Sequence, residues 1–133
     1  SWLELACHDP AKTPYPEEWR LTRARDLAEM FEAFREWCGG PLIVLSGYRM
    51  PAWNAHVGGA RHSQHVQGRA VDLRHAGWNM ARFHREAKAF AEAHPALVGG
   101  LGLYPKFVHL DTRDTDRLVV WNGTRPKAEV RHA

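Results

Sequence analysis

Two segments of the chain repeat apolar residues at the spacing of an α-helix. In the first, over residues 22–38, apolar positions recur every three or four residues, as they do on one face of a helix. These positions are Leu27, Met30, Phe31, Phe34 and Trp37. Thr22 stands where an N-cap residue is favoured, and the run Gly39-Gly40-Pro41 is a stop signal. The pattern predicts a helix over 22–38.

The second helical segment covers about 80–93. Its apolar side consists of Met80, Phe83, Ala87, Phe90 and Ala91. Asn79 precedes the segment as a candidate N-cap, and Pro95 ends it because proline cannot continue a helix.

Short apolar or alternating runs predict strands, which are 42–45, 69–74, 101–104, 107–112 and 118–121. The run 42–45 lies between turn signals and is expected to be a buried strand. The order of helix, strands, helix, strands predicts an α+β domain with a mainly antiparallel sheet and helices packed on one side.

The segments without a clear period complete the predicted organisation. Residues 1–20 hold three prolines and are expected to form an irregular lead-in that packs its apolar side chains on the domain. Those side chains are Trp2, Leu3, Leu5 and Trp19. A loop as long as 46–64 is usually functional or disordered in a small domain. The polar tail 123–133 is expected to be flexible, and the length of 133 residues suits one domain over 1–133.

Composition narrows the classes of protein. With 44% hydrophobic and 25% charged residues, the chain is neither of disordered nor of membrane composition. No apolar stretch is long enough to span a bilayer, and the start Ser1-Trp2-Leu3-Glu4 lacks the pattern of a signal peptide. The net charge is +3, but no run of five basic residues favours nucleic acid as a partner. Cys7 and Cys38 are compatible with one disulfide or with two free thiols.

Candidate chemistry begins at the end of the long loop. His65 ends this loop, and Asp72 lies in the predicted strand that follows. Since side chains alternate along a strand, Val71 and Leu73 point to one face and Asp72 to the other. A carboxylate within an apolar strand needs a cation, hydrogen bonds or water. Gly68 lets the chain turn so that His65 can fold back over Asp72.

The strand 107–112 has the same parity. Val108 and Leu110 share one face, while Phe107, His109 and Asp111 share the other. If the two strands lie close together, His65, Asp72 and His109 converge, and two imidazoles with one carboxylate suit zinc. The alternative is a solvent-facing sheet with ordinary charges, because this spacing alone is a weak metal signal.

A longer ordered set of residues makes the interpretation specific. The chain reads Ser46-Gly47-Tyr48-Arg49, Pro51, Asn54, Gly58-Gly59-Ala60, then Ser-x-His-x-x-Gly-x-Ala-x-Asp over 63–72, then Gly100-Leu101-Gly102-Leu103-Tyr104-Pro105 and Phe107-Val108-His109-Leu110-Asp111. This set, from about residue 40 to 121, resembles the zinc D-alanyl-D-alanine peptidase family. That family includes cell-wall L,D- and D,D-endopeptidases and shares its fold with the hedgehog signalling domain. The ending is most similar to small murein endopeptidases, which are periplasmic, extracellular or phage-borne.

The resemblance implies a zinc peptidase that cuts peptidoglycan stem peptides, as a carboxypeptidase or as a cross-link endopeptidase. It implies Zn²⁺ ligands at His65, Asp72 and His109. Arg49 matches an arginine that faces the substrate, where it can bind a carboxylate or stabilise an oxyanion. Ser63 and Gln64 are candidates for orienting the ligand loop or binding substrate.

The chain departs from the family pattern at the general base. Relatives have an acidic residue three positions before the last histidine ligand, or a histidine two positions before it; here these positions are Lys106 and Phe107. Asp111 is therefore the nearest catalytic candidate, either as the base or as the group that binds the second ring nitrogen of His109. His56 and His62 are weaker candidates.

Two other functions are compatible with the sequence. The missing base leaves open a non-catalytic zinc-containing module that binds cell wall or protein. A small DNA-associated domain is a third interpretation, but it leaves the His, Asp and Ser-Gly-Tyr-Arg pattern unexplained. The sequence does not determine the oligomeric state or the bond that is cut.

Overall fold

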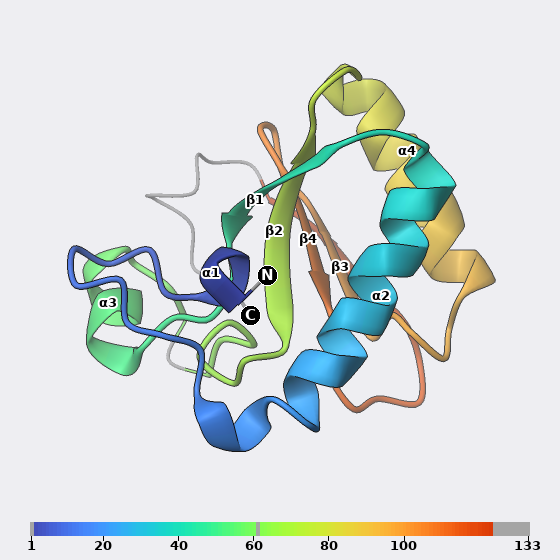
Figure 1. Ribbon diagram of the computed structural model, residues 1–133. Helices are drawn as coiled ribbons and strands as arrows, with labels where there is room; N and C mark the ends of the chain where they lie inside the picture. The colour runs from blue at the N-terminus through green and yellow to red at the C-terminus, as the bar shows by residue number, and fades with distance from the viewer. Residues whose placement is uncertain (1, 61, 124–133) are drawn as a thin grey trace.

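The computed structural model describes residues 2–60 and 62–123, apart from the side chains of residues 2 and 3 (Figure 1). The predicted packing of Trp2 and Leu3 and the predicted flexibility of residues 124–133 lie outside this description. Among the described residues, no helix has the length and apolar character needed to cross a bilayer.

Five strands form one mixed sheet in the order β1-β2-β4-β3-β5. They are β1 (Leu42–Ser46), β2 (Ala70–His75), β3 (Gly100–Leu103), β4 (Val108–Asp111) and β5 (Val119–Asn122). The pairs β1–β2, β2–β4 and β3–β4 are antiparallel, whereas β3–β5 is parallel. The α+β prediction is therefore confirmed, and the expectation of an antiparallel sheet holds for three of the four pairings.

Two long helices, α2 (Arg23–Cys38) and α4 (Met80–Ala93), lie together on one side of the sheet (Figure 1). Asn79 caps α4 as predicted, since its side-chain oxygen accepts a 2.9 Å bond from the Arg82 amide. Thr22 occupies the N-cap of α2 but makes no side-chain cap bond, so its predicted capping role is wrong. Gly39 ends α2 with a φ of 65°, a left-handed conformation that glycine adopts without strain.

The helices and the sheet enclose the main core. Its buried members from the helices are Leu27, Met30, Phe34, Cys38, Phe83, Ala87, Phe90 and Ala91. Its buried members from the strands and the loop before β3 are Val71, Leu73, Val98, Leu101, Val108 and Leu110. The predicted apolar faces of both helices and of strands β2 and β4 thus meet in one cluster, except for Trp37, which is 42% exposed. Cys7 and Cys38 are separate buried thiols, and burial raises the pKa of Cys38 to about 12.

Three short helices occur where irregular structure was expected. The lead-in contains α1 (Trp2–Leu5) and a 3-10 helix (Glu17–Trp19), and the long loop contains α3 (Pro51–His56). Figure 1 shows α3 on the opposite side of the sheet from α2 and α4. The strand predicted at 42–45 is confirmed as β1, but its predicted burial is wrong, because β1 is an edge strand and Ile43 is 37% exposed.

Candidate metal centre

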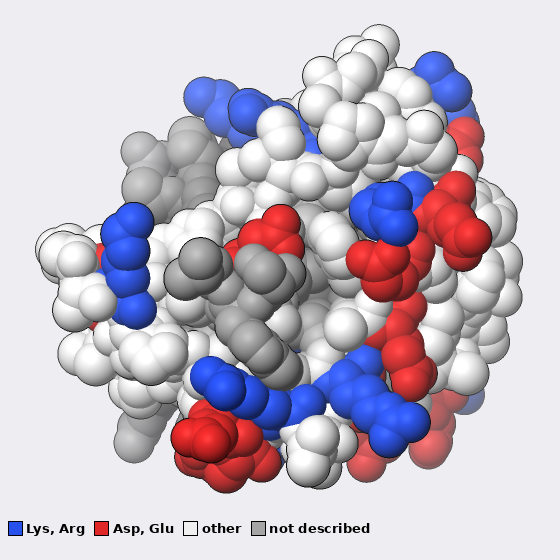
Figure 2. Space-filling model, viewed as in Figure 1, with Lys and Arg blue, Asp and Glu red and all other residues white. Residues whose placement is uncertain are grey.

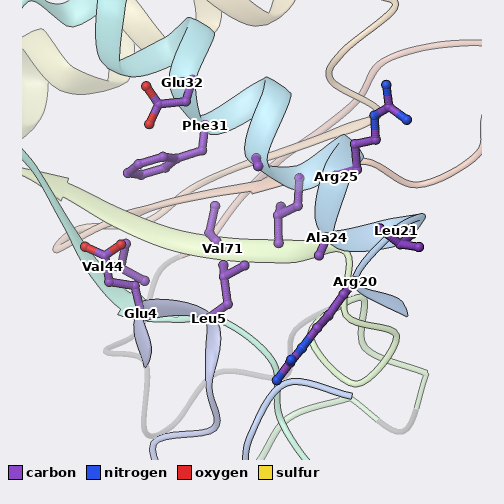
Figure 3. A pocket seen from close by; sticks show the side chains of 12 residues that line it. Glu4, Leu5, Arg20, Leu21, Ala24, Arg25, Phe31, Glu32, Val44 and Val71 are labelled. Atoms are coloured by element: carbon purple, nitrogen blue, oxygen red, sulfur yellow. The ribbon is translucent and has the colours of Figure 1, made fainter. Parts of the chain in front are cut away.

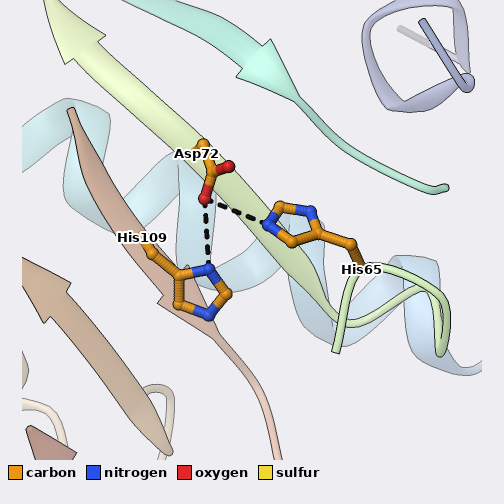
Figure 4. Close-up of side chains that lie close together, drawn as sticks. All are labelled: His65, Asp72 and His109. Atoms are coloured by element: carbon orange, nitrogen blue, oxygen red, sulfur yellow. Dashed lines mark hydrogen bonds and ion pairs between the residues drawn. The ribbon is translucent and has the colours of Figure 1, made fainter. Parts of the chain in front are cut away.

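Three predicted ligands converge on the face of the sheet away from α2 and α4 (Figure 4). Strands β2 and β4 are neighbours, and their register sets Asp72 directly opposite His109. Asp72 Oδ1 lies 3.0 Å from His65 Nε2 and 3.1 Å from His109 Nδ1. All three ligand atoms lie within 4.8 Å of one another. All three side chains are 0% exposed, so the alternative of an ordinary solvent-facing sheet is wrong.

His65 is held so that one ring nitrogen faces Asp72. Its Nδ1 lies 2.8 Å from the carbonyl oxygen of Gly47. A carbonyl only accepts, so Nδ1 carries the hydrogen and Nε2 the lone pair of the neutral ring. Burial lowers the pKa of His65 well below its usual value, against the opposing charge of Asp72. A lone pair and a carboxylate oxygen at 3.0 Å repel each other unless a proton or a metal cation lies between them.

His109 presents its ring in a comparable way. Its Nε2 lies 2.7 Å from Asp111 Oδ2, which leaves Nδ1 turned toward the carboxylate of Asp72. Burial alone would lower the pKa of His109, but the hydrogen bonds to Asp111 and Asp72 outweigh it and raise the pKa. A metal ion displaces the proton of such a nitrogen on binding. The nitrogen and oxygen donors of this set therefore fit zinc, whose bonds of about 2.0–2.2 Å place tetrahedral donors roughly 3.3 Å apart.

Asp111 lies behind His109 rather than beside Asp72. Arg113 donates to both of its oxygens, from Nε to Oδ1 at 2.9 Å and from Nη2 to Oδ2 at 2.7 Å. Burial alone would raise the pKa of Asp111, but the bonds from His109 and Arg113 outweigh it and hold the pKa well below its usual range. A Cβ at Gly100 would collide with this carboxylate, so the glycine makes room for the pair. Sequence reasoning did not anticipate Arg113.

Arg49 is buried on the other side of Asp72. Its Nη2 lies 3.3 Å from Asp72 Oδ2, the carboxylate oxygen that faces away from the two histidines. Its other nitrogens donate to Ser46 Oγ at 3.2 Å and to Asn54 Oδ1 at 3.1 Å. The guanidinium is 1% exposed, and Asn54 belongs to the helix α3 that the sequence pattern missed. The structure therefore places Arg49 where it fixes the orientation of Asp72.

The remaining candidates from the sequence fall into two groups. Ser63 is buried, and its Oγ accepts a 3.1 Å bond from the amide of His65, which shapes the ligand loop. Gln64 is half-buried, and its side-chain oxygen is buried without a hydrogen-bond partner among the described residues. By contrast, the side chains of His56, His62 and Lys106 are exposed.

The lead-in holds the loop that supplies His65. The hydroxyl of Tyr15 donates to the carbonyl of Gly68 at 2.8 Å, and Arg23 Nη1 donates to the carbonyl of Gln67 at 2.9 Å. Gly68 has a φ of 70°, and a Cβ on it would come within 2.7 Å of the Trp19 ring. Residues far apart in the sequence thus set the position of a ligand, and no local pattern indicates this.

Aromatic side chains flank the ligands on the β5 side. The ring of Trp121 lies 5.1 Å from the ring of His109, and its Nε1 donates to the hydroxyl of Tyr104 at 2.8 Å. Tyr104 stacks on Phe107 with ring centroids 4.5 Å apart. The sequence analysis placed Tyr104 in the quoted motif and Trp121 in a predicted strand, but it gave neither residue a role at this centre.

A largely apolar pocket of about 610 Å³ lies between α2, the lead-in and the sheet, but its lining includes none of the three ligands (Figure 3). Figure 2 shows that Lys and Arg side chains on the face viewed are interspersed with Asp and Glu.

Comparisons with known proteins agree with the geometry. The family model described as peptidase M15 matches residues 4–111, a range that includes all three ligands. The chain is also 34% identical over 76 residues to the probable peptidoglycan L,D-endopeptidase MepK of Haemophilus influenzae. That alignment covers 52% of the chain and 38% of the relative, so the chain spans less than half of the relative's length. No solved structure gives a significant match.

Proposed function

Because this chain belongs to the peptidase M15 family, we propose that it is a zinc-dependent peptidase that hydrolyses peptide bonds in the stem peptides of peptidoglycan. One observation carries the proposal: the two imidazoles and the carboxylate of Asp72 turn their ligand atoms to one point inside the protein. The name of the relative supports peptidoglycan as the substrate and an L,D bond as the one that is cut. Such an enzyme acts where peptidoglycan lies, which is in the periplasm or outside the cell. A phage-borne enzyme would act on the same substrate.

In the proposed centre, His65, Asp72 and His109 hold a zinc ion. Bound zinc would polarise a carbonyl and lower the pKa of water. Asp111 binds the second ring nitrogen of His109 and orients that ring. Arg49 fixes the Asp72 carboxylate from behind and offsets its charge. These contacts keep the ligand atoms in place before any ion or substrate arrives.

Substrate binding is proposed for the ligand loop. The buried side-chain oxygen of Gln64 can accept a hydrogen bond from a peptide N–H of the substrate, because the described residues do not use it. Ser63 shapes this loop through the amide of His65 and acts on the substrate indirectly. Arg49 remains a candidate for binding a stem-peptide carboxylate only if the substrate displaces one of its present partners.

The reaction adds water to the carbonyl carbon of the scissile bond, breaks the C–N bond and leaves the proton on the released amine. Of the two roles left open for Asp111, we favour orientation over general base. Its two oxygens already accept bonds from His109 and Arg113, which stabilise the charged form and weaken it as a proton acceptor.

The test is to incubate the purified protein with isolated peptidoglycan, with and without a zinc chelator, and to weigh the released fragments by mass spectrometry. Fragments that vanish with chelator and return with zinc are expected, and their masses identify the bond. His65→Ala should lose both zinc and activity, whereas His8→Ala, a change at an exposed histidine, should keep both. Stoichiometric zinc without any cleavage would refute the peptidase proposal and favour the non-catalytic binding module.

A further inference from the structure

The face of β3 next to the metal centre carries no side chains. Gly100 and Gly102 pair with Asp111 and His109 across the β3–β4 register. Side chains of directly opposed residues share a face of the sheet, so both glycines leave room beside strand β4 for other side chains. A Cβ at Gly102 would come within 2.8 Å of both Trp121 and Tyr104. These two aromatic rings therefore fill the space over Gly102, next to His109.

The position of Tyr104 is tightly constrained. Its ring stacks on Phe107 at 4.5 Å with an angle of 10° between the planes. Its backbone amide donates to the carbonyl of Phe107 at 3.1 Å, and its carbonyl lies 2.6 Å from His84 Nε2. Phe107 lies two residues before the ligand His109 on the same strand face, so the phenol ring is anchored to the ligand strand itself.

The hydroxyl of Tyr104 has a defined polarity. Trp121 Nε1 donates to its oxygen at 2.8 Å, and an indole can only donate. The Tyr104 oxygen is thus an acceptor in that bond. Burial raises the pKa of Tyr104, although the bond from Trp121 opposes the shift. The phenol therefore stays protonated at neutral pH and keeps its capacity to donate.

Two other donors near this centre have different positions. Arg49 binds Ser46, Asn54 and the outer oxygen of Asp72. Lys106, which occupies the position of the acidic residue in many relatives, is exposed. Among the described residues, Tyr104 and Trp121 meet over Gly102, the residue that pairs with His109 on the β3 side.

Resting on the function proposed above, we propose that Tyr104 is a catalytic residue whose hydroxyl donates a hydrogen bond to the substrate carbonyl oxygen while water adds to that carbonyl. The oxygen gains negative charge in this step, and a fixed donor stabilises it more than it stabilises the uncharged substrate. Tyr104 keeps its proton throughout. Trp121 aligns the hydroxyl and does not itself contact the substrate.

The experiment compares Tyr104→Phe with Tyr48→Phe in the full zinc-loaded chain, with a soluble cross-linked muropeptide as substrate. Tyr48 is a matched control because it is partly buried and loses the same oxygen atom. Tyr104→Phe should lower kcat by about 100-fold with little change in KM or zinc content, and it should lower the melting temperature no more than Trp121→Phe does, since both changes remove the same bond. Tyr48→Phe should leave all four unchanged.

A second measurement separates a catalytic role from a structural one. A phosphinate analogue of the scissile bond imitates the charged tetrahedral carbon, so Tyr104→Phe should weaken its binding by the same factor by which kcat/KM falls. Trp121→Phe keeps an aromatic ring beside His109 but lacks the indole donor, and it should lower kcat by about 10-fold.

Three outcomes would overturn the inference. Tyr104→Phe with a kcat within about threefold of the wild type excludes the hydroxyl from the reaction and leaves the peptidase proposal intact. If Tyr104→Phe loses zinc or thermal stability but binds the phosphinate as tightly as the wild type at saturating zinc, Tyr104 has a structural role and not a catalytic one. A wild-type protein that binds zinc but cuts no peptide refutes the proposed function and this inference together.

Discussion

The bond between Tyr15 and Gly68 links the lead-in to the ligand loop, and its removal tests whether that link positions His65. The Tyr15 hydroxyl donates to the Gly68 carbonyl at 2.8 Å, and its side chain is 1% exposed. In Tyr15→Phe the ring can keep its edge contacts with Trp19 and Tyr48, so no cavity forms. The change isolates one hydrogen bond across 53 residues of sequence.

The expected magnitude follows from the buried carbonyl that remains. A buried acceptor left without its partner costs about 1–3 kcal/mol. The unfolding free energy of the metal-free protein should fall by an amount in this range. If about 1.4 kcal/mol of that cost destabilises the conformation of the ligand loop that binds zinc, the affinity for zinc should fall by about tenfold.

Two assays measure the two effects. Urea unfolding of the metal-free variant gives the change in stability, and competition with a chelating dye gives the zinc affinity. Tyr48→Phe is the control, because its aromatic ring contacts Tyr15 and Trp19 but the described structure shows no bond from its hydroxyl to the ligand loop. Reduced stability with unchanged zinc affinity would refute the positioning argument, since the bond would then stabilise the fold without acting on His65.

Two further predictions follow from the metal centre and the core. Asp111→Asn should lower zinc affinity by about 10–100-fold, because it weakens the partner that orients the His109 ring. The control Asp114→Asn, at an exposed site, should leave zinc affinity unchanged. Equal zinc affinities of the two variants in the dye competition would contradict the orienting role of Asp111. Phe34→Ala should destabilise the protein by about 3–5 kcal/mol in urea unfolding, because Phe34 is 0% exposed. Phe31→Ala, at a partly buried position of the same helix, should cost less, and a reversed order would contradict the packing described.

The elements that could be predicted were those with a local periodicity. The spacing of Phe83, Ala87 and Phe90 identified the inner face of α4, and Asn79 marked its start correctly. The alternation in β2 and β4 separated core-facing aliphatics from the ligand face in the same way. A backbone of fixed period requires these patterns, so they are visible without any knowledge of the fold.

The elements that were missed are short or depend on neighbours. Helix α3 has only six residues, too few for a period, and it lies within a segment rich in turn residues. The strand run 42–45 looks buried, but β1 has a neighbouring strand on one side only. The parallel pairing of β3 with β5 also has no local signature, because it depends on the path of the chain between the two strands.

The same distinction divides the metal centre. The sequence by itself indicated His65, Asp72 and His109 as the candidate ligands, from their motif and from strand parity. Only the tertiary structure decided that Arg49 lies behind Asp72, that Asp111 binds His109 with Arg113, that Tyr15 holds the loop before β2, and that Tyr104 meets Trp121. These roles depend on strand register and on contacts between distant segments, which place side chains to within an ångström. Local backbone periodicity determines only the face on which a side chain lies.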